Sequence, residues 1–246
     1  YLKAFSNSTL QYNAIIISLY GCFENYFDEL LKYYIDFLLI NTSNIENLPK
    51  NFSDRYMHKV GDYLSNPQRY TGIELTPPEV VEQYNIFLKS DFSSGIDKSL
   101  LITHSGNLKT EEIIRTLQEL GIPQVRSKIL NSEILKNYYV PQFYDDQEFV
   151  QKRSRDESNN RDSLFAPWEE LVEQRNSVAH SWKEFNRLSI ETILNNHIKF
   201  IRMFSDILLR ILLAHLFCLI PESSYHFIQK HPINVFNNKI CCFNND

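Results

Sequence analysis

The chain is poor in the residues that break helices and build tight turns, since its 246 residues include only six glycines and nine prolines. An all-β fold of this size needs many turns, so this scarcity argues against that class and favours long helices. Long apolar runs are also missing. The most apolar stretch, residues 208–220, is shorter than a membrane span and carries Arg210 and His215, so no membrane-spanning helix is expected.

Cysteines are few as well, and the chain has no net positive charge. Cys22 and Cys218 have apolar helical surroundings, which predict core positions. The adjacent Cys241-Cys242 pair follows His226 and His231 at a spacing that fits no standard zinc pattern, so we expect no metal and no cofactor. No signal peptide is visible, which favours a reduced, cytoplasmic protein. The net charge of −5 means that any contact with nucleic acid has to be local.

Apolar residues recur at helical spacing over two very long segments, 8–39 and 189–220. Ser8 and Ser189 are the expected N-caps, and Pro221 ends the second helix. Shorter helices are predicted between them, at residues 52–64, at 80–88 after the helix start Thr76-Pro77-Pro78-Glu79, and at 111–120 and 167–180. This layout predicts an all-α bundle.

Four further features complete the predicted organisation. Thr110 is the expected N-cap of the helix over 111–120, which Gly121 and Pro123 close. Residues 100–103 are expected to form a short strand or turn. The most polar segment, 147–162, is predicted to be an exposed loop. The helical domain is expected over residues 1–221, followed by an irregular tail over 222–246.

Residues suited to cutting a phosphodiester lie together in one predicted helix. Arg175 is followed directly by Asn176, and His180 comes four residues later. A histidine exchanges protons near neutral pH, and an arginine is always charged and matches phosphate oxygens with its fork of donors. An asparagine can orient a ribose hydroxyl or the histidine. These residues point to cleavage of RNA.

This Arg-Asn-x3-His pattern resembles the Arg-x4–6-His motif of the HEPN superfamily, in the form of defence- and toxin-associated members similar to RiboL-PSP-HEPN proteins. Tyr20-Gly21-Cys22-Phe23-Glu24-Asn25-Tyr26 looks like the N-terminal element that places an acidic residue among aromatics. His104-Ser105-Gly106-Asn107-Leu108, before a helix ending in Leu120-Gly121-Ile122, is also similar. The resemblance touches most of residues 10–220. It implies an antiparallel helical bundle that commonly dimerises, and metal-independent endoribonuclease activity in bacterial toxin and anti-phage systems.

The resemblance and the chemistry together assign roles to four residues. His180 is the expected acid and base, Arg175 the group that stabilises the phosphorane, and Asn176 and Glu24 the groups that orient them. Positions five apart on a helix are rotated by about 140°, so Arg175 and His180 point to different sides. The site therefore needs either a distorted helix or two copies of the motif across a dimer, as HEPN nucleases are known to use.

Each of these residues also has a plain structural interpretation. Arg175 and His180 are compatible with an ordinary polar helix end, where a histidine in the last turn suits the helix dipole. Glu24 is compatible with a solvent-facing position between Phe23 and Asn25. Asn107 is expected to be a simple loop residue rather than part of the site.

Lys152, Arg153 and Arg155, together with Arg161, form a local basic cluster just before the motif helix. They are candidate RNA-binding residues, with a solvated charged loop as the alternative. Trp182 is a candidate for stacking on a base, and its alternative is an indole packed beneath a helix end.

A second pair with the same spacing, Arg210 and His215, has no asparagine after the arginine and lies in an almost wholly apolar segment. We expect it to be part of the core, with both polar side chains paired or extended toward solvent.

The sequence thus predicts a cytoplasmic HEPN-type endoribonuclease that acts on RNA, forms a homodimer, has no membrane partner, and works as a toxin or defence effector with an antitoxin or defence-complex partner. The alternative is a non-catalytic HEPN module for assembly, or the neutralised partner of a nucleotidyltransferase. Such a module has no need of Arg175, Asn176 and His180 together.

Overall fold

The computed structural model describes residues 2–70, 73–92, 96–104, 107–140, 143–159, 163–180 and 189–219. Helices are the regular secondary structure of this described part, which confirms the predicted all-α class. They are α1 (Leu2–Ile40), α2 (Lys50–Ser65), α3 (Pro77–Leu88), α4 (Ser99–Ile102), α5 (Thr110–Glu119), α6 (Val125–Leu130), α7 (Glu133–Tyr139), α8 (Asp146–Asn159), α9 (Ala166–His180), α10 (Ile190–Thr192) and α11 (Lys199–Leu219). The predicted tail over 222–246 lies outside the described residues.

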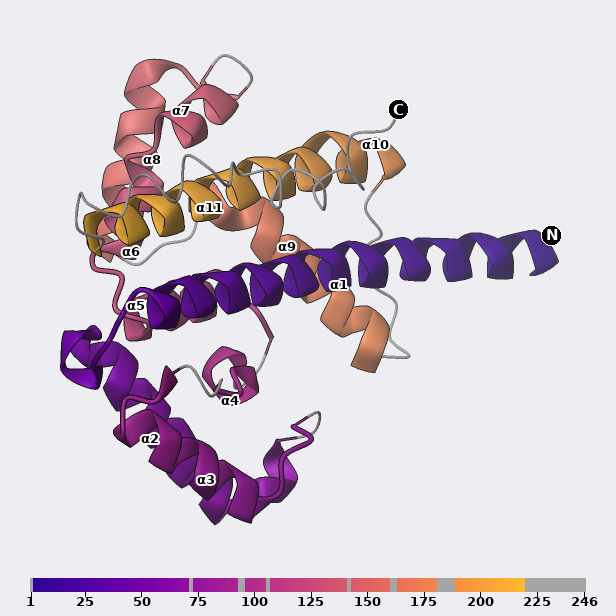
Figure 1. Cartoon of the computed structure of the whole chain (residues 1–246). Helices are drawn as coiled ribbons and strands as arrows, with labels where there is room; N and C mark the ends of the chain where they lie inside the picture. Colours follow the sequence, from indigo (N-terminus) through magenta and orange to yellow (C-terminus); the bar gives the residue numbers. More distant parts are fainter. Residues whose placement is uncertain are drawn as a thin grey trace, which may run out of the picture.

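Three helices form the centre of the fold (Figure 1). α1 and α11 lie side by side and run in the same direction, because Tyr26 donates its hydroxyl to the Ser205 carbonyl at 3.1 Å and Tyr34 meets His215 further along both helices at 2.9 Å. α9 crosses α1 in the opposite sense. The expected antiparallel packing therefore holds for α9 against α1. The two long helices are parallel, because the helices between them return the chain to the same end of the molecule.

Aromatic side chains fill the space where these three helices meet. Phe23 of α1 packs against Phe204 of α11 with ring centroids 5.8 Å apart, and against Trp168 of α9 at 4.3 Å. All three side chains are buried. Truncating such a residue to alanine costs about 3–5 kcal/mol of folding free energy, so these contacts hold α1, α9 and α11 as one unit. That unit fixes the position of the motif helix.

The chain between α1 and α5 forms a smaller layer below the central helices (Figure 1). α2 packs on α3, α4 and α5, and α4 contacts α1. Arg55 of α2 is buried and joins these elements, since its Nε donates to the Leu101 carbonyl at 2.9 Å and its guanidinium pairs with Glu119. The predicted start of α3 is confirmed by a capping box between Thr76 and Glu79.

The segment predicted to be an exposed loop, 147–162, is a helix over most of its length, and this prediction is wrong. α8 ends at Asn159, and Asp145 accepts from the Glu148 backbone N–H at 2.8 Å at its start. Its buried face consists of few residues, among them Phe149 and the carboxylate of Asp156, which accepts from the Leu164 N–H at 2.8 Å. So narrow a buried face leaves little apolar periodicity in the sequence.

The second long helix has the predicted start but not the predicted regularity. Ser189 Oγ accepts from the Thr192 N–H at 3.0 Å, which confirms the N-cap. A π-helical turn, η5 (Ile193–Ile198), then separates α10 from α11. His197 lies in this turn, buried, with Nδ1 2.6 Å from the Pro167 carbonyl at the start of α9. Burial lowers the pKa of His197, although the contact with Pro167 opposes the shift.

Two other local predictions are wrong, and the choice between a strand and a turn at residues 100–103 is decided. α1 begins at Leu2, so Ser8 lies inside the helix, because no glycine or proline precedes it to stop the helix earlier. α5 includes Thr110, and Lys109 occupies the N-cap position. The Thr110 N–H donates instead to Glu169 of α9 at 2.8 Å, a tertiary contact that no local pattern shows. Residues 99–102 form the helical turn α4 rather than a strand.

Cys22 and Cys218 are exposed, in contrast to the predicted core positions. Each shares its helix with many buried apolar residues but lies on the outer face; Cys22 follows the buried Tyr20 and precedes the buried Phe23. An apolar neighbourhood in sequence therefore does not place every member of a helix in the core. None of the helices within the described residues has the length and apolar character needed to span a bilayer.

Gly121 ends α5 in a way that no other residue can reproduce. It adopts a positive φ of 95°, and a Cβ at this position would lie 2.4 Å from Cβ of Pro49. Its N–H and that of Ile122 bond to the carbonyls of Gln118 and Leu117, which closes the helix. The predicted closure of this helix by glycine is confirmed.

We predict that Gly121→Ala lowers the free energy of unfolding by about 2–4 kcal/mol, because it combines backbone strain with a clash. Gly61→Ala is the control. Gly61 lies inside α2, and its added Cβ would meet nothing within 4 Å. This change should stabilise the protein by up to about 1 kcal/mol. Urea unfolding of both variants measures the difference. Equal stabilities would show that position 121 does not require glycine.

Candidate functional site

Residues 107–110 lie between α1 and α9 and are bound to both. The Leu108 N–H donates to the Tyr20 hydroxyl of α1 at 2.9 Å, and the Leu108 carbonyl accepts from Trp168 Nε1 of α9 at 2.8 Å. The contact of Glu169 with the Thr110 N–H adds a third bond. Leu108 is fully buried, so these partners replace the water that its backbone groups have lost. The segment is therefore held in one position relative to the motif helix.

Tyr20 is the residue on which these contacts converge. Its ring stacks on Trp168 with centroids 5.7 Å apart and an interplanar angle of 7°. Its hydroxyl accepts from Leu108 and donates to Glu24 Oε1 at 3.1 Å. Burial, opposed by the Leu108 hydrogen bond and reinforced by Glu24, raises the pKa of Tyr20 to about 12. Tyr20 therefore stays neutral near pH 7 and serves as a platform and a hydrogen-bonding group, not as a base.

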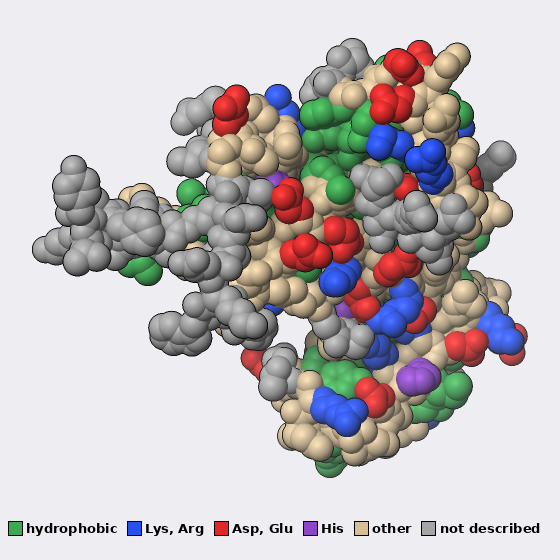
Figure 2. Space-filling view, turned by 180° about the vertical axis from the view of Figure 1, so that it is seen from behind, with side chains coloured by type: hydrophobic (Ala, Val, Ile, Leu, Met, Phe, Trp, Pro, Cys, Tyr) green, Lys and Arg blue, Asp and Glu red, His purple; other side chains and the backbone are tan. Residues whose placement is uncertain are grey.

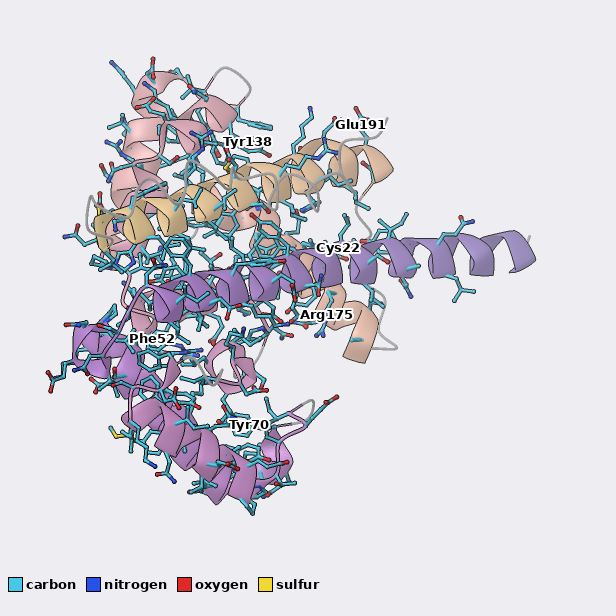
Figure 3. All side chains as sticks on the ribbon, viewed as in Figure 1. Cys22, Phe52, Tyr70, Tyr138, Arg175 and Glu191 are labelled. Atoms are coloured by element: carbon cyan, nitrogen blue, oxygen red, sulfur yellow. The ribbon has the colours of Figure 1, made fainter. Side chains whose placement is uncertain are left out.

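Arg175 lies on this platform, where α9 crosses α1 (Figure 3). Its guanidinium carbon is 4.8 Å from the centre of the Tyr20 ring. One of its terminal nitrogens donates to Asn107 Oδ1 at 2.9 Å and to Asn176 Oδ1 at 3.2 Å. The side chain is half-buried. A cation stacked on an aromatic ring and held by two amide oxygens is fixed in orientation before any ligand arrives.

The structure brings together three of the residues that sequence reasoning singled out, Arg175, Asn176 and Asn107. Asn107, for which a simple loop position is expected, accepts a hydrogen bond from Arg175 across 68 positions of sequence. Tyr20 was missed as a contact of Arg175. Its place in the aromatic segment around Glu24 was the one signal available.

His180 is the last residue of α9, and its side chain lies outside the described part of the structure. α9 is regular over its 15 residues, so the rotation of about 140° between Arg175 and His180 stands. Gln174, next to Arg175, accepts from the Tyr12 hydroxyl of α1 at 3.0 Å. The motif helix is therefore fixed against α1 on both sides of Tyr20.

Glu24 lies one contact away from Arg175. It accepts from the Tyr20 hydroxyl, and His104 Nε2 lies 4.0 Å from its Oε1. The side chain is 32 % exposed, so it is neither a plain solvent-facing residue nor a core residue. Its described link to Arg175 runs through Tyr20.

The basic cluster lies elsewhere on the chain. Lys152, Arg153 and Arg155 belong to α8, at the upper left of Figure 1, whereas Arg175 in Figure 3 lies below and to the right. Lys152 lies over the ring of Tyr144 at 4.7 Å. Within one chain, the structure does not bring this cluster to Arg175. Trp182, like Arg161, lies outside the described residues.

The second Arg-x4-His pair has the environment expected of it. Arg210 is exposed and forms an ion pair with Asp206, one turn earlier, at 3.2 Å. His215 Nδ1 lies 2.9 Å from the Tyr34 hydroxyl, and burial lowers its pKa. Both side chains have partners, Arg210 on the surface and His215 against Tyr34, and neither partner is a contact of Arg175.

A described groove is also separate from Arg175. It has a volume of about 510 Å³ and lies between α2 and α5. Its charges pair with one another, Arg55 with Glu119 and Arg115 with Glu112, so they do not form a free cationic surface for phosphate. On the face shown in Figure 2, acidic and basic side chains are likewise interspersed.

We predict that Tyr20→Phe destabilises the fold by about 1–3 kcal/mol, because it leaves the buried Leu108 N–H without its acceptor. Tyr12→Phe is the matched control, since it removes a part-buried bond to the Gln174 side chain and leaves no buried backbone group without an acceptor, and it should cost less than about 1 kcal/mol. Chemical denaturation compares the two. A Tyr20→Phe protein as stable as the Tyr12→Phe protein would show that the Leu108 contact is not needed.

Comparison with known proteins gives one match. The sequence model of the family described as RiboL-PSP-HEPN matches residues 7–214. Searches of curated proteins and of solved structures found no match. The matched range includes most of α1, the 107–110 segment and the whole of α9.

Proposed function

Because the chain belongs to the RiboL-PSP-HEPN family, we propose that it is a metal-independent endoribonuclease with its active centre at Arg175, Asn176 and His180. The observation that carries the proposal is the preorganised guanidinium of Arg175, held by the Tyr20 ring and by Asn107. A fixed cation stabilises charge that develops on a phosphate better than a mobile one does, because no reorganisation is needed during the reaction.

The proposed reaction uses the nucleophile that RNA itself carries. His180 takes the proton of a 2′-hydroxyl, and the oxygen attacks the adjacent phosphorus. The bond from phosphorus to the 5′-oxygen breaks, and that oxygen takes up a proton from a protonated histidine. Arg175 stabilises the negative charge of the pentacoordinate phosphorane. The products are a 2′,3′-cyclic phosphate and a 5′-hydroxyl end.

Tyr20, Asn107 and Glu24 act as positioning residues in this proposal, because Tyr20 and Asn107 hold Arg175 and Glu24 holds the Tyr20 hydroxyl. The biological setting that we propose is a cytoplasmic toxin or defence effector that is restrained by a partner protein. RNA is the substrate, and Lys152, Arg153, Arg155 and Trp182 are the proposed additional RNA contacts.

We predict that His180→Ala and Arg175→Ala each lower RNA cleavage by a factor of roughly 100 or more, because proton transfer and charge stabilisation each contribute at least that much. Cleavage by the unmodified protein should be insensitive to EDTA. The assay is cleavage of a labelled RNA without added metal. A requirement for Mg²⁺, or full activity of His180→Ala, would rule out this mechanism.

His215→Leu is the control for the choice of motif. His215 pairs with Tyr34, whose hydroxyl also lies 3.3 Å from the Leu120 carbonyl, so the tyrosine keeps a partner after the substitution. The folded variant should cleave RNA at the rate of the unmodified protein. If it does not, the second pair contributes to the site. A well-folded protein that cleaves no RNA would instead support the non-catalytic assembly role.

The proposed nuclease is a homodimer. Positions 175 and 180 are rotated by about 140° on a regular α9, so in this proposal two copies bring both types of side chain to one phosphate. A two-fold interface pairs the same surface of each chain. The N-terminal half of α1, which Tyr12 ties to α9, carries the exposed apolar side chains Leu10 and Ile17, at 66 % and 49 % exposure. This surface is the proposed contact between copies.

We predict that Ile17→Asp converts the dimer to a monomer and lowers RNA cleavage at least tenfold, because a buried unpaired charge costs more than a typical contact contributes. Val81→Asp in α3 is the control, since Val81 is similarly exposed at 43 % but lies in a different layer. Light scattering at micromolar concentration measures assembly. A monomer that still cleaves RNA would refute the composite site.

A further inference from the structure

His104 lies beside the candidate site, but no role in the reaction has been given to it. Its Nε2 is 3.5 Å from Asp28 Oδ1 and 4.0 Å from Glu24 Oε1, and its side chain is only 14 % exposed. Glu24 and Asp28 are four residues apart on α1 and therefore share a face. The imidazole thus lies against two carboxylates, and it forms ion pairs with them only when it is protonated.

Glu24 and Asp28 follow Tyr20 at four-residue spacing on α1, so all three lie on the face of the helix that supports Arg175. Glu24 accepts from the hydroxyl of Tyr20, whose ring supports the guanidinium. Asp28 Oδ1 is buried and makes no hydrogen bond among the described residues. With a neutral His104, two negative charges lie on this face of α1, and their attraction for the Arg175 guanidinium opposes its binding of a phosphate. A protonated His104 compensates one of them.

The other charged groups described around this segment have contacts of their own. Lys32 of α1 is close enough to Asp28 to interact with it and is paired with Glu29. On α2, Lys59 donates to the Thr103 carbonyl at 2.6 Å. Arg55 donates to the same carbonyl at 3.4 Å. These contacts fix the backbone just before His104, so its ring is held against α1.

We propose that His104 is a positioning residue that makes the site depend on pH: when protonated, it pairs with Glu24 and Asp28 and leaves the Arg175 guanidinium available to an RNA phosphate. The proposal rests on the proposed function, because it concerns RNA binding at the same site. It predicts that RNA binds more tightly at acid than at alkaline pH. It also predicts that this dependence comes from His104 rather than from His180.

The test measures binding of a 2′-O-methyl RNA oligonucleotide, which lacks the nucleophile and cannot be cut. All proteins carry His180→Ala, which removes the other imidazole of the site. Affinity is measured between about pH 5.5 and 8.5, the range over which histidine titrates in proteins. The variants are His104→Gln and Asp28→Asn, and the control is His58→Gln, which alters an exposed histidine of α2.

The parent and His58→Gln should bind about three- to tenfold more tightly at the acid end than at the alkaline end, the range expected for a partly exposed ion pair. His104→Gln should bind weakly at both ends, without this dependence. Asp28→Asn, which removes one of the two competing charges, should bind tightly at both. A His104→Gln or Asp28→Asn protein with the pH profile of the parent would overturn the proposal.

A second measurement separates this proposal from the proposed function. If the parent binds no RNA at any pH, the proposed function fails, and thermal unfolding then decides on the ion pairs alone. A contact made by the protonated form stabilises the fold at acid pH and is lost as the pH rises. The parent should therefore unfold at a higher temperature than His104→Gln at the acid end, with the gap closing toward alkaline pH. A gap that is independent of pH would refute the pairing.

Discussion

The burial of the Leu108 backbone between α1 and α9 is the constraint on which the candidate site depends. A non-helical segment can enter a helical core only if its peptide groups find partners there, since an unpaired buried group costs about 1–3 kcal/mol. Tyr20 and Trp168 supply those partners, one from each helix. The same two aromatic rings stack on each other, and Trp168 also packs against Phe23 in the core. Hydrogen bonding and packing therefore specify a single arrangement of the two helices.

The orientation of Arg175 follows from this arrangement. The hydroxyl of Tyr20 accepts from the Leu108 N–H, and the face of the same ring supports the guanidinium. Asn107, just before Leu108, supplies the amide oxygen to which Arg175 donates. Tyr20 thus both stabilises the fold through Leu108 and orients Arg175 in the candidate site. Arg175 is held by groups from α1 and from the 107–110 segment, which are distant in sequence, and is kept half-buried by them.

Features of the fold that depend on neighbouring residues could be predicted from the sequence, whereas features that depend on tertiary contacts could not. The two long helices, the N-cap at Ser189 and the glycine that closes α5 leave local patterns, and they were predicted. The helix α8 was missed because its buried face is narrow. Cys22 was misplaced because periodicity identifies a helix more reliably than it identifies the face on which each residue lies.

The candidate site shows the same division. Arg175 and Asn176 are neighbours in sequence, and their contact is local. The partners that fix the guanidinium, Tyr20 and Asn107, lie 155 and 68 positions away, and only folding brings them close. The cap that Glu169 provides for α5 is of the same kind. A single sequence carries no record of such pairings, whereas the chemistry of each residue type can be recognised without them.

The π-helical turn η5 has a consequence for how the chain can vary in length. A π turn takes about one residue more than an α turn, so it is in effect an insertion that the helix has absorbed without a loop. Each residue of an α-helix adds a rotation of about 100°, so the segments on either side of η5 are out of phase with a single continuous helix. Loss of one residue from this turn would restore a regular helix and rotate the cap at Ser189 around the axis of α11. One additional residue therefore sets the direction in which the chain enters α11. That residue is accommodated in the turn that contains His197, which is buried against the start of α9.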